Sequence, residues 1–228
     1  MATADDTRER ILESAASTFA EKGYDAATIR DICHKAGANQ GAINYHFGDK
    51  EQLYVELIKR AHRLRAEQVP LPNWHRNTRS EDKLRDFIRV TITRMVDDPA
   101  PKWQMQLMMR EMFQPTETCR ALVQDFFRPH FEALLSILSE MLPATVPLEK
   151  RHLIGFSIIG QCLQYRVARP VVSLLVGEQE NARFTSNVLA EHITEFSLAA
   201  IRGIASPPPP IDDRAKRIEW PKRPEVSP

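Results

Sequence analysis

The sequence predicts an all-α protein with a small N-terminal helical domain and a larger C-terminal helical domain. Three observations lead to this fold class. Apolar residues recur at helical spacing in successive segments. All sixteen prolines lie at or after Pro70, and four of the eight glycines lie before residue 50. This distribution is typical of short helices joined by tight turns and followed by longer helices.

The composition is that of an ordinary globular protein. The 228 residues include 31 Lys and Arg against 30 Asp and Glu, so the net charge of +1 gives no whole-chain argument for nucleic-acid binding. Three scattered cysteines are too few for a disulfide framework and favour the cytoplasm. Because no apolar run approaches the ~20 residues of a bilayer span and the N-terminus lacks a signal-peptide pattern, we expect no membrane association.

The first 67 residues predict four helices. One covers residues 7–22, with Asp6 as its cap and Gly23 as its end. A second begins at Thr28, where Thr28-Ile-Arg-Asp31 has the spacing of a capping box, and Gly37 ends it. Two more are expected over residues 40–46 and 50–67.

Two short helices joined by a glycine-containing turn, behind a longer supporting helix, make a helix-turn-helix unit. A helix of ~10–12 Å diameter fits the B-DNA major groove, which is ~12 Å wide. The second short helix then needs an apolar back and a front of small or polar residues. Ile43 and Phe47 supply the back. The front consists of Gln40, Gly41, Ala42 and Asn44.

Three ordered motifs in this region resemble the TetR family of transcriptional repressors. They are the stretches 11–24, 27–37 and 41–53, which read ILESAASTFAEKGY, ATIRDICHKAG and GAINYHFGDKEQL. The resemblance implies an all-helical homodimer without cofactor or metal. It assigns residues 1–55 to a helix-turn-helix DNA-binding domain, with a linking helix to about residue 67. Residues 78–205 would then form a helical ligand-binding and dimerisation domain.

The resemblance also implies DNA contacts, position by position. Thr28, Tyr45, His46 and Lys50 would contact phosphates, and Arg30 a base edge or a phosphate. Many relatives have Tyr where this chain has Asn44, so Asn44 is left open between adenine, phosphate and no contact. The local charge over residues 28–50 is only slightly positive, which predicts a moderate dependence of binding on salt. The expected DNA-binding residues are Thr28, Arg30, Asn39, Gln40, Gly41, Ala42, Asn44, Tyr45, His46 and Lys50.

The C-terminal zone predicts at least five helices. Thr78-Arg-Ser-Glu81 would cap the first, and others are expected over residues 103–113, 116–141, 148–169 and 182–204. Pro129 predicts a kink or break near Arg128. In the TetR family the last two helices usually pair with the same helices of the second subunit. For each residue on them, the alternative to a dimer contact is packing within its own chain. The candidate dimer residues are Leu153, Phe156, Ile159, Leu163, Val188, His192, Phe196 and Leu198.

Three further motifs look like the C-terminal domain of the CecR-like (YbiH-like) branch, which is linked to efflux, transport or drug-sensitivity genes. They are the stretches 109–116, 128–131 and 156–162. Methionines gather in this zone, and they suit either an adaptable pocket or an ordinary core. Arg110 and Glu111 lie on an otherwise apolar helix. Arg110 could pair with Glu111 through a neighbour, hold Gln161 in place or meet an anionic ligand, and a structural ion pair is preferred over ligand binding. The candidate ligand-binding residues are Trp103, Met108, Met109, Met112, Phe113, Phe127, Phe131, Gln161 and Tyr165.

The leading hypothesis is a repressor released from a palindromic DNA operator by a small apolar or amphipathic effector. A DNA-binding activator or dual regulator is the alternative. A further alternative is a protein-interaction module that uses the Pro-rich tail, residues 206–228. An enzyme is disfavoured, because no HExxH, GxSxG, CxxC or phosphate-loop motif occurs and the seven histidines form no ligand-spaced cluster.

Overall fold

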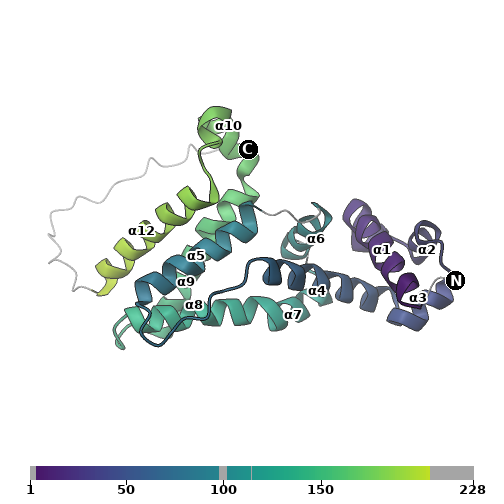
Figure 1. Cartoon of the computed structure of the whole chain (residues 1–228), viewed down its shortest axis with the longest axis horizontal. Helices are drawn as coiled ribbons and strands as arrows, with labels where there is room; N and C mark the ends of the chain where they lie inside the picture. Colours follow the sequence, from purple (N-terminus) through teal and green to yellow (C-terminus); the bar gives the residue numbers. More distant parts are fainter. Residues whose placement is uncertain (1–3, 98–101, 114, 206–228) are drawn as a thin grey trace, which may run out of the picture.

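The computed structural model describes residues 4–97, 102–113 and 115–205, and helices form all of the regular secondary structure within them. The molecule is elongated, with the first three helices at one end and a helical bundle at the other (Figure 1). The all-α prediction is confirmed. The predicted Pro-rich tail, residues 206–228, lies outside the described residues.

Four helices build the N-terminal part: α1 (Ala4–Ala26), α2 (Ile29–Ala36), α3 (Gln40–Phe47) and α4 (Lys50–Gln68). Asp6 does not cap α1, because the helix already begins at Ala4 and Asp6 lies in its first turn. Gly23 interrupts α1 with φ 83°, a conformation that an L side chain rarely adopts. The last three residues of α1 thus follow a break rather than extend the regular helix.

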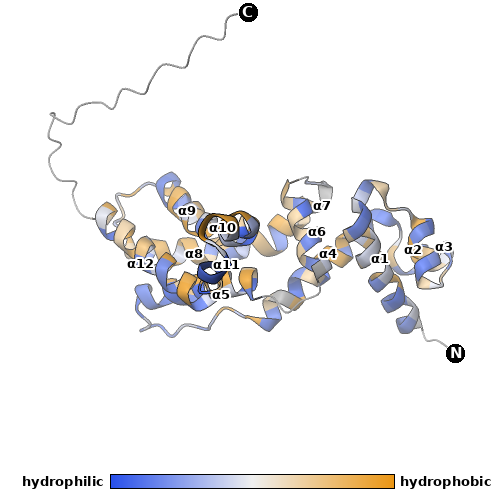
Figure 2. Cartoon of the chain, turned by 90° about the horizontal axis from the view of Figure 1, so that it is seen from above, coloured by the Kyte–Doolittle hydropathy of each residue, from blue (hydrophilic) through white to orange (hydrophobic). Residues whose placement is uncertain are grey.

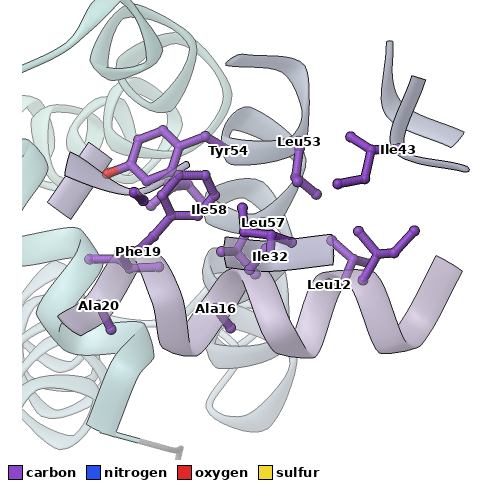
Figure 3. Packing of buried hydrophobic residues seen from close by; sticks show 14 of the residues in the cluster. Leu12, Ala16, Phe19, Ala20, Ile32, Ile43, Leu53, Tyr54, Leu57 and Ile58 are labelled. Carbon is purple, nitrogen blue, oxygen red and sulfur yellow. The ribbon is translucent and has the colours of Figure 1, made fainter. Parts of the chain in front are cut away.

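The N-terminal helices share one hydrophobic cluster, in which Tyr54 lies at the end nearest Phe19 and its hydroxyl points away from Leu53 and Ile43 (Figure 3). Leu107 and Leu122 belong to the same cluster, although they come from α6 (Lys102–Phe113) and α7 (Glu117–Leu122). The core of the N-terminal helices therefore continues into the next part of the chain.

A buried hydrogen bond fastens α6 to α4. The Tyr54 hydroxyl donates to Glu111 Oε1 at 2.8 Å, and Thr116 Oγ1 donates to the same carboxylate at 3.0–3.1 Å. Tyr54 and Glu111 are 1 % and 2 % exposed. Burial, and then the adjacent Glu111 charge, raise the pKa of Tyr54 far above its usual range. The phenol consequently stays protonated, and so a hydrogen-bond donor, well above neutral pH.

Four helices form the C-terminal bundle: α5 (Ser80–Val96), α8 (Arg128–Met141), α9 (Leu148–Val167) and α12 (Ser186–Ala205). α5 packs against the other three. The capping box predicted at Thr78 is wrong, because α5 begins at Ser80 and no side chain caps it.

The break predicted near Arg128 is present as a change of helix type. α7 passes into a π-helical turn, η1 (Val123–Phe127), and α8 starts at Arg128 with Pro129 in its first turn. A proline is tolerated there because the first amides of a helix have no partner within the helix. The wider π turn lets Phe126 stack on His62 of α4, with ring centroids 4.3 Å apart.

Two short helices between α9 and α12 were not predicted: α10 (Arg169–Val176) and α11 (Glu178–Asn181). α9 ends at Val167, and Pro170 lies in the first turn of α10. None of the described helices combines the length and hydropathy that crossing a bilayer requires.

The first prediction concerns the bond between α4 and α6. Tyr54→Phe should lower the free energy of unfolding by about 1–3 kcal/mol, because the buried Glu111 carboxylate loses a donor. Urea denaturation followed by circular dichroism measures this. Tyr45→Phe is the matched control, since Tyr45 is 81 % exposed and should change stability little. Equal effects of the two substitutions would contradict the structural role of the bond.

The second prediction concerns His130. Its ring stacks on Phe87, and its Nε2 lies 3.0 Å from Thr91 Oγ1. Burial, and then the nearby Arg94 charge, lower the pKa of His130 to about 4. In the unfolded chain this imidazole takes up a proton near pH 6.5. Lowering the pH from 6.5 to 4 therefore lowers the free energy of unfolding, by about 3 kcal/mol in all.

Unfolding free energies measured across this pH range should therefore fall less steeply in His130→Gln than in the unchanged protein. His34→Gln is the control, because His34 is exposed on α2. A pH slope that is the same in His130→Gln would show that His130 does not titrate as expected.

Candidate functional site

The exposed face of α3 is polar and narrow. Gln40, Gly41, Asn44 and Tyr45 are exposed at spacings of one and four residues, while Ile43 behind them is fully buried. The N-terminus of α2, with exposed Thr28 and Arg30, lies at the same end of the molecule (Figure 1). Three of the four residues predicted for the front of this helix, Gln40, Gly41 and Asn44, are thus exposed, and Ile43 of the predicted back is buried.

Side chains cap both short helices. Thr28 Oγ1 accepts from the Asp31 amide at 3.1 Å, and Asp31 Oδ2 accepts from the Thr28 amide at 3.3 Å, which completes the capping box. Asn39 Oδ1 accepts from the Ala42 amide at 2.8 Å. A Cβ at Gly41 would come within 3.2 Å of that oxygen, so glycine leaves room for the cap. Asn39 therefore has a structural role beside any DNA contact.

Most lysines near this face are already engaged. Lys22 bonds Asp31 at 2.8 Å, and Lys35 lies 3.6 Å from Glu21. Lys50 lies 4.5 Å from the centre of the Tyr24 ring. Lys22, followed by Thr28, lowers the pKa of Asp31 to about 2, so the carboxylate stays ionised down to that pH. These contacts offset part of the lysines' positive charge, whereas exposed Arg30 has no ion pair among the described residues.

Three expected DNA contacts are less exposed than the rest. Ala42, His46 and Lys50 are half-buried. The His46 ring lies edge-on to Tyr45, with centroids 5.0 Å apart. Tyr45 itself projects into solvent. Phe47 seals the end of α3 under the Arg8 guanidinium, which lies 5.2 Å from its ring centre. Arg8 is a supporting residue that spacing alone did not indicate.

The nine candidate ligand-binding residues do not gather in one pocket. Trp103 and Phe127 pack against the first hydrophobic cluster, and Phe131 stacks on Phe156 at 4.8 Å. Gln161 donates to the Ser157 carbonyl, and Tyr165 lies edge-on to Phe184 beside a cavity of only about 10 Å³. Three others lie on α6 with different exposure. Met108 is half-buried, while Met112 and Phe113 are 42 % and 67 % exposed.

A larger cleft of about 430 Å³ opens between α1, α6 and the end of α9. It includes two of the predicted ligand residues, Met109 and Phe113. Arg110 also lines it, and Arg110 Nη2 donates to the Ala20 carbonyl at 3.4 Å. The ion pair expected for Arg110 is absent among the described residues, since Glu111 accepts from Tyr54 and Thr116. The remaining lining residues are Ala20, Met105, Gln106 and Arg166.

The candidate dimer residues divide into two groups. Leu153, Phe156, Val188 and Phe196 are 52–60 % exposed, and His192 is exposed between the last two on α12. Ile159 and Leu163 are half-buried on α9. Leu198 is a correction: it is buried in the core of its own chain, so it does not belong to a surface.

Sequence reasoning missed the partners of the α6 side chains. Arg110 and Glu111 stood out as charges on an apolar helix, but Ala20 and Tyr54 lie 90 and 57 residues away along the chain. Within the described ranges, no group of three or more His, Cys, Asp or Glu side chains is arranged to hold a metal ion.

A helix-turn-helix at one end of an all-helical chain, with an exposed polar recognition helix, defines a DNA-binding protein of the transcription-regulator class. Two family models match the chain. The model for bacterial regulatory proteins of the tetR family matches residues 11–57. The model described as "HTH-type transcriptional dual regulator CecR, C-terminal domain" matches residues 80–201, more than half of the chain. The protein belongs to the TetR family and carries a CecR-type C-terminal domain; members are transcriptional regulators, not enzymes.

A relative of known function is a regulator of the same kind. The HTH-type transcriptional repressor AcnR of Corynebacterium efficiens is 44 % identical over 63 residues, 28 % of this chain and 34 % of AcnR. The matched segment thus spans about a third of that relative's length.

Solved structures support the fold. A TetR-like regulator from Rhodococcus sp. RHA1 superimposes with a TM-score of 0.59 at 16 % identity, over 86 % of this chain and 96 % of that one. AibR, solved with isovaleryl coenzyme A and operator DNA, gives a TM-score of 0.57 at 18 % identity, over 83 % and 97 %.

The third prediction separates capping from DNA contact at Asn39. Asn39→Ala should lower the free energy of unfolding by about 1 kcal/mol, because the Ala42 amide loses its acceptor. Asn44→Ala is the control on the same helix, since Asn44 is exposed and caps nothing in the described structure. Thermal denaturation of both variants measures the difference. A neutral Asn39→Ala would contradict the capping role.

Proposed function

We propose that the protein is a repressor that binds a palindromic DNA operator as a homodimer. A small apolar or amphipathic effector bound to the C-terminal domain would release it. The observation that carries the proposal is the polar front of α3, with Gln40, Gly41 and Asn44 exposed over the buried Ile43. Gln40 is suited to reading a base, and the hydroxyls of Thr28 and Tyr45 to holding phosphates.

The exposed apolar surface of α9 and α12 supports the homodimer. Large apolar side chains that are more than half exposed are costly to leave in water, and a second copy would bury them. α10 also exposes large apolar side chains, with Leu174 and Leu175 at 87 % and 78 % exposure, and is coloured largely hydrophobic in Figure 2. A dimer of this kind would place its two α3 helices in successive major grooves, ~34–36 Å apart.

A dual role is the second candidate function. The family model that matches residues 80–201 takes its description from a dual regulator, CecR, whereas AcnR is a repressor. AibR, which was solved with both an acyl-coenzyme A and operator DNA, supports the response to an effector. Repression is preferred because occupying an operator needs no additional contact with the transcription machinery.

A gel shift on the DNA upstream of the protein's own gene tests the proposal, with unrelated DNA as competitor at physiological salt. Footprinting should then show two half-sites one helical turn apart or a multiple of it. If that DNA is not bound, selection of binders from random DNA shows whether the protein binds any DNA sequence specifically. Failure to select any sequence would contradict the DNA-binding proposal, and a single half-site would contradict the dimer.

The fourth prediction separates base reading from phosphate contact. Gln40→Ala should reduce the preference for the operator over unrelated DNA, by about 1–3 kcal/mol at the contacted base. Tyr45→Phe combined with Lys50→Ala should weaken binding to all sequences alike and lower the salt slope. Titrations on both DNAs at two salt concentrations measure both effects. A uniform loss on every sequence for Gln40→Ala would show that Gln40 does not read a base.

A further inference from the structure

We propose that Arg8 is a positioning residue for DNA binding, because its guanidinium holds the C-terminal end of α3 against α1 and α4. The inference rests on the proposed function, in which α3 is the helix that reads DNA. Arg8 is not among the expected DNA contacts. It also precedes residues 11–57, which the tetR family model matches.

The Arg8 side chain joins three helices. It extends from α1, and its Nη2 donates to Glu56 Oε1 of α4 at 3.0 Å. The same guanidinium lies 5.2 Å from the ring centre of Phe47, the last residue of α3. That distance is within the ~6 Å over which an aromatic face attracts a cation. One side chain thus links the end of α3 to both long helices of the DNA-binding domain.

The angle of α3 depends on few anchors. The helix has eight residues, fewer than the ~12 that a helix needs to be stable by itself in water, so contacts with its neighbours must hold it. Ile43 is its buried residue, and half-buried Phe47 packs against the same cluster one turn later. A helix held only at Ile43 could tilt about that point. The contact at Phe47 therefore determines the direction of the recognition face.

The ion pair fixes the place of the guanidinium more than it adds to stability. The side chains of Arg8 and Glu56 are 39 % and 33 % exposed, and ion pairs of such exposure contribute little to the free energy of unfolding. Arg63 lies 3.6 Å from the same Glu56 oxygen, so a second cation shares that carboxylate. The contribution we assign to Glu56 is to keep the Arg8 guanidinium over the Phe47 ring.

A second ion pair between α1 and α4 supplies the matched control. Arg60 of α4 donates through Nη1 and Nη2 to the two carboxylate oxygens of Glu9, at 2.6 and 2.5 Å. Its partners are 32 % and 44 % exposed, much like those of the Arg8 pair. It joins the same two helices without a residue of α3. Arg60→Gln and Arg8→Gln remove the same charge, and only Arg8→Gln removes the contact with Phe47.

Hydrogen exchange of the free full-length protein, followed by mass spectrometry, tests whether Arg8 holds α3. Arg8→Gln should speed amide exchange in peptides that cover residues 40–47 by about two- to fivefold, the range expected for an exposed cation–π contact. Arg60→Gln should leave these peptides unchanged. Arg8→Lys keeps a cation for both Glu56 and Phe47, so its α3 peptides should exchange more slowly than those of Arg8→Gln.

Operator binding separates positioning from a direct phosphate contact. The probe is the duplex recovered by the gel shift or by selection from random DNA, and its affinity is measured by fluorescence anisotropy at several salt concentrations. Arg8→Gln should weaken binding by about fivefold or more, since both subunits lose the contact. Its salt slope should stay unchanged, because no phosphate contact is lost. Arg60→Gln should bind like the unchanged protein.

Each other result overturns the inference in a recognisable way. A salt slope that falls by about 0.9 per subunit in Arg8→Gln would show that Arg8 contacts a phosphate directly. Unchanged exchange of the α3 peptides in Arg8→Gln, or equal losses of operator affinity in Arg8→Gln and Arg60→Gln, would show that Arg8 does not position α3. If the unchanged protein selects no DNA, the proposed function fails, and the exchange data still decide whether Arg8 holds α3.

Discussion

The buried hydrogen bond between Tyr54 and Glu111 is the constraint on which the arrangement of the two domains depends. A carboxylate that is 2 % exposed must be satisfied by donors, and the donors here come from α4 and from Thr116. This requirement sets the rotation of α6 about its axis. With Glu111 facing α4, the neighbouring face of α6 carries Met105, Met109 and Arg110 into the cleft beside α1. One buried acid thus determines which side of α6 faces this cleft.

The same constraint makes α6 part of the DNA-binding domain's core. Leu107 lies in the cluster that contains Phe19, Ile32 and Tyr54, so α6 cannot shift without disturbing the packing behind α2. Close-packed interiors respond to displacement by moving neighbouring elements as units. A displacement of α6 would consequently reach the packing behind the helix-turn-helix.

Local signals in the sequence were sufficient for the elements and the recognition face, but not for the contacts between domains. Thr28, Gly37 and Ile43 act through neighbours within a few residues, so capping and periodicity identified them. The partners of Arg110 and Glu111 are 90 and 57 residues away, and no local pattern encodes such a distance. The prediction that Leu198 lies in the dimer interface was wrong for a related reason. A place on one of the last two long helices does not tell which side of an amphipathic helix faces its own core and which faces a partner. No helix was expected between residues 169 and 182, although Pro170 lies in the first turn of α10, a position where proline is tolerated.

The electrostatics of the recognition face decide what kind of signal can release DNA. Lys22, Lys35 and Lys50 are held by Asp31, Glu21 and Tyr24, so few free cations remain to attract phosphates without regard to geometry. Binding would then depend on neutral donors and helix N-termini, whose hydrogen bonds weaken steeply with misalignment. A protein bound in this way is sensitive to small rotations of its supporting helix. A displacement of α1, which packs on both α2 and α3, would therefore misalign these hydrogen bonds and lower the affinity.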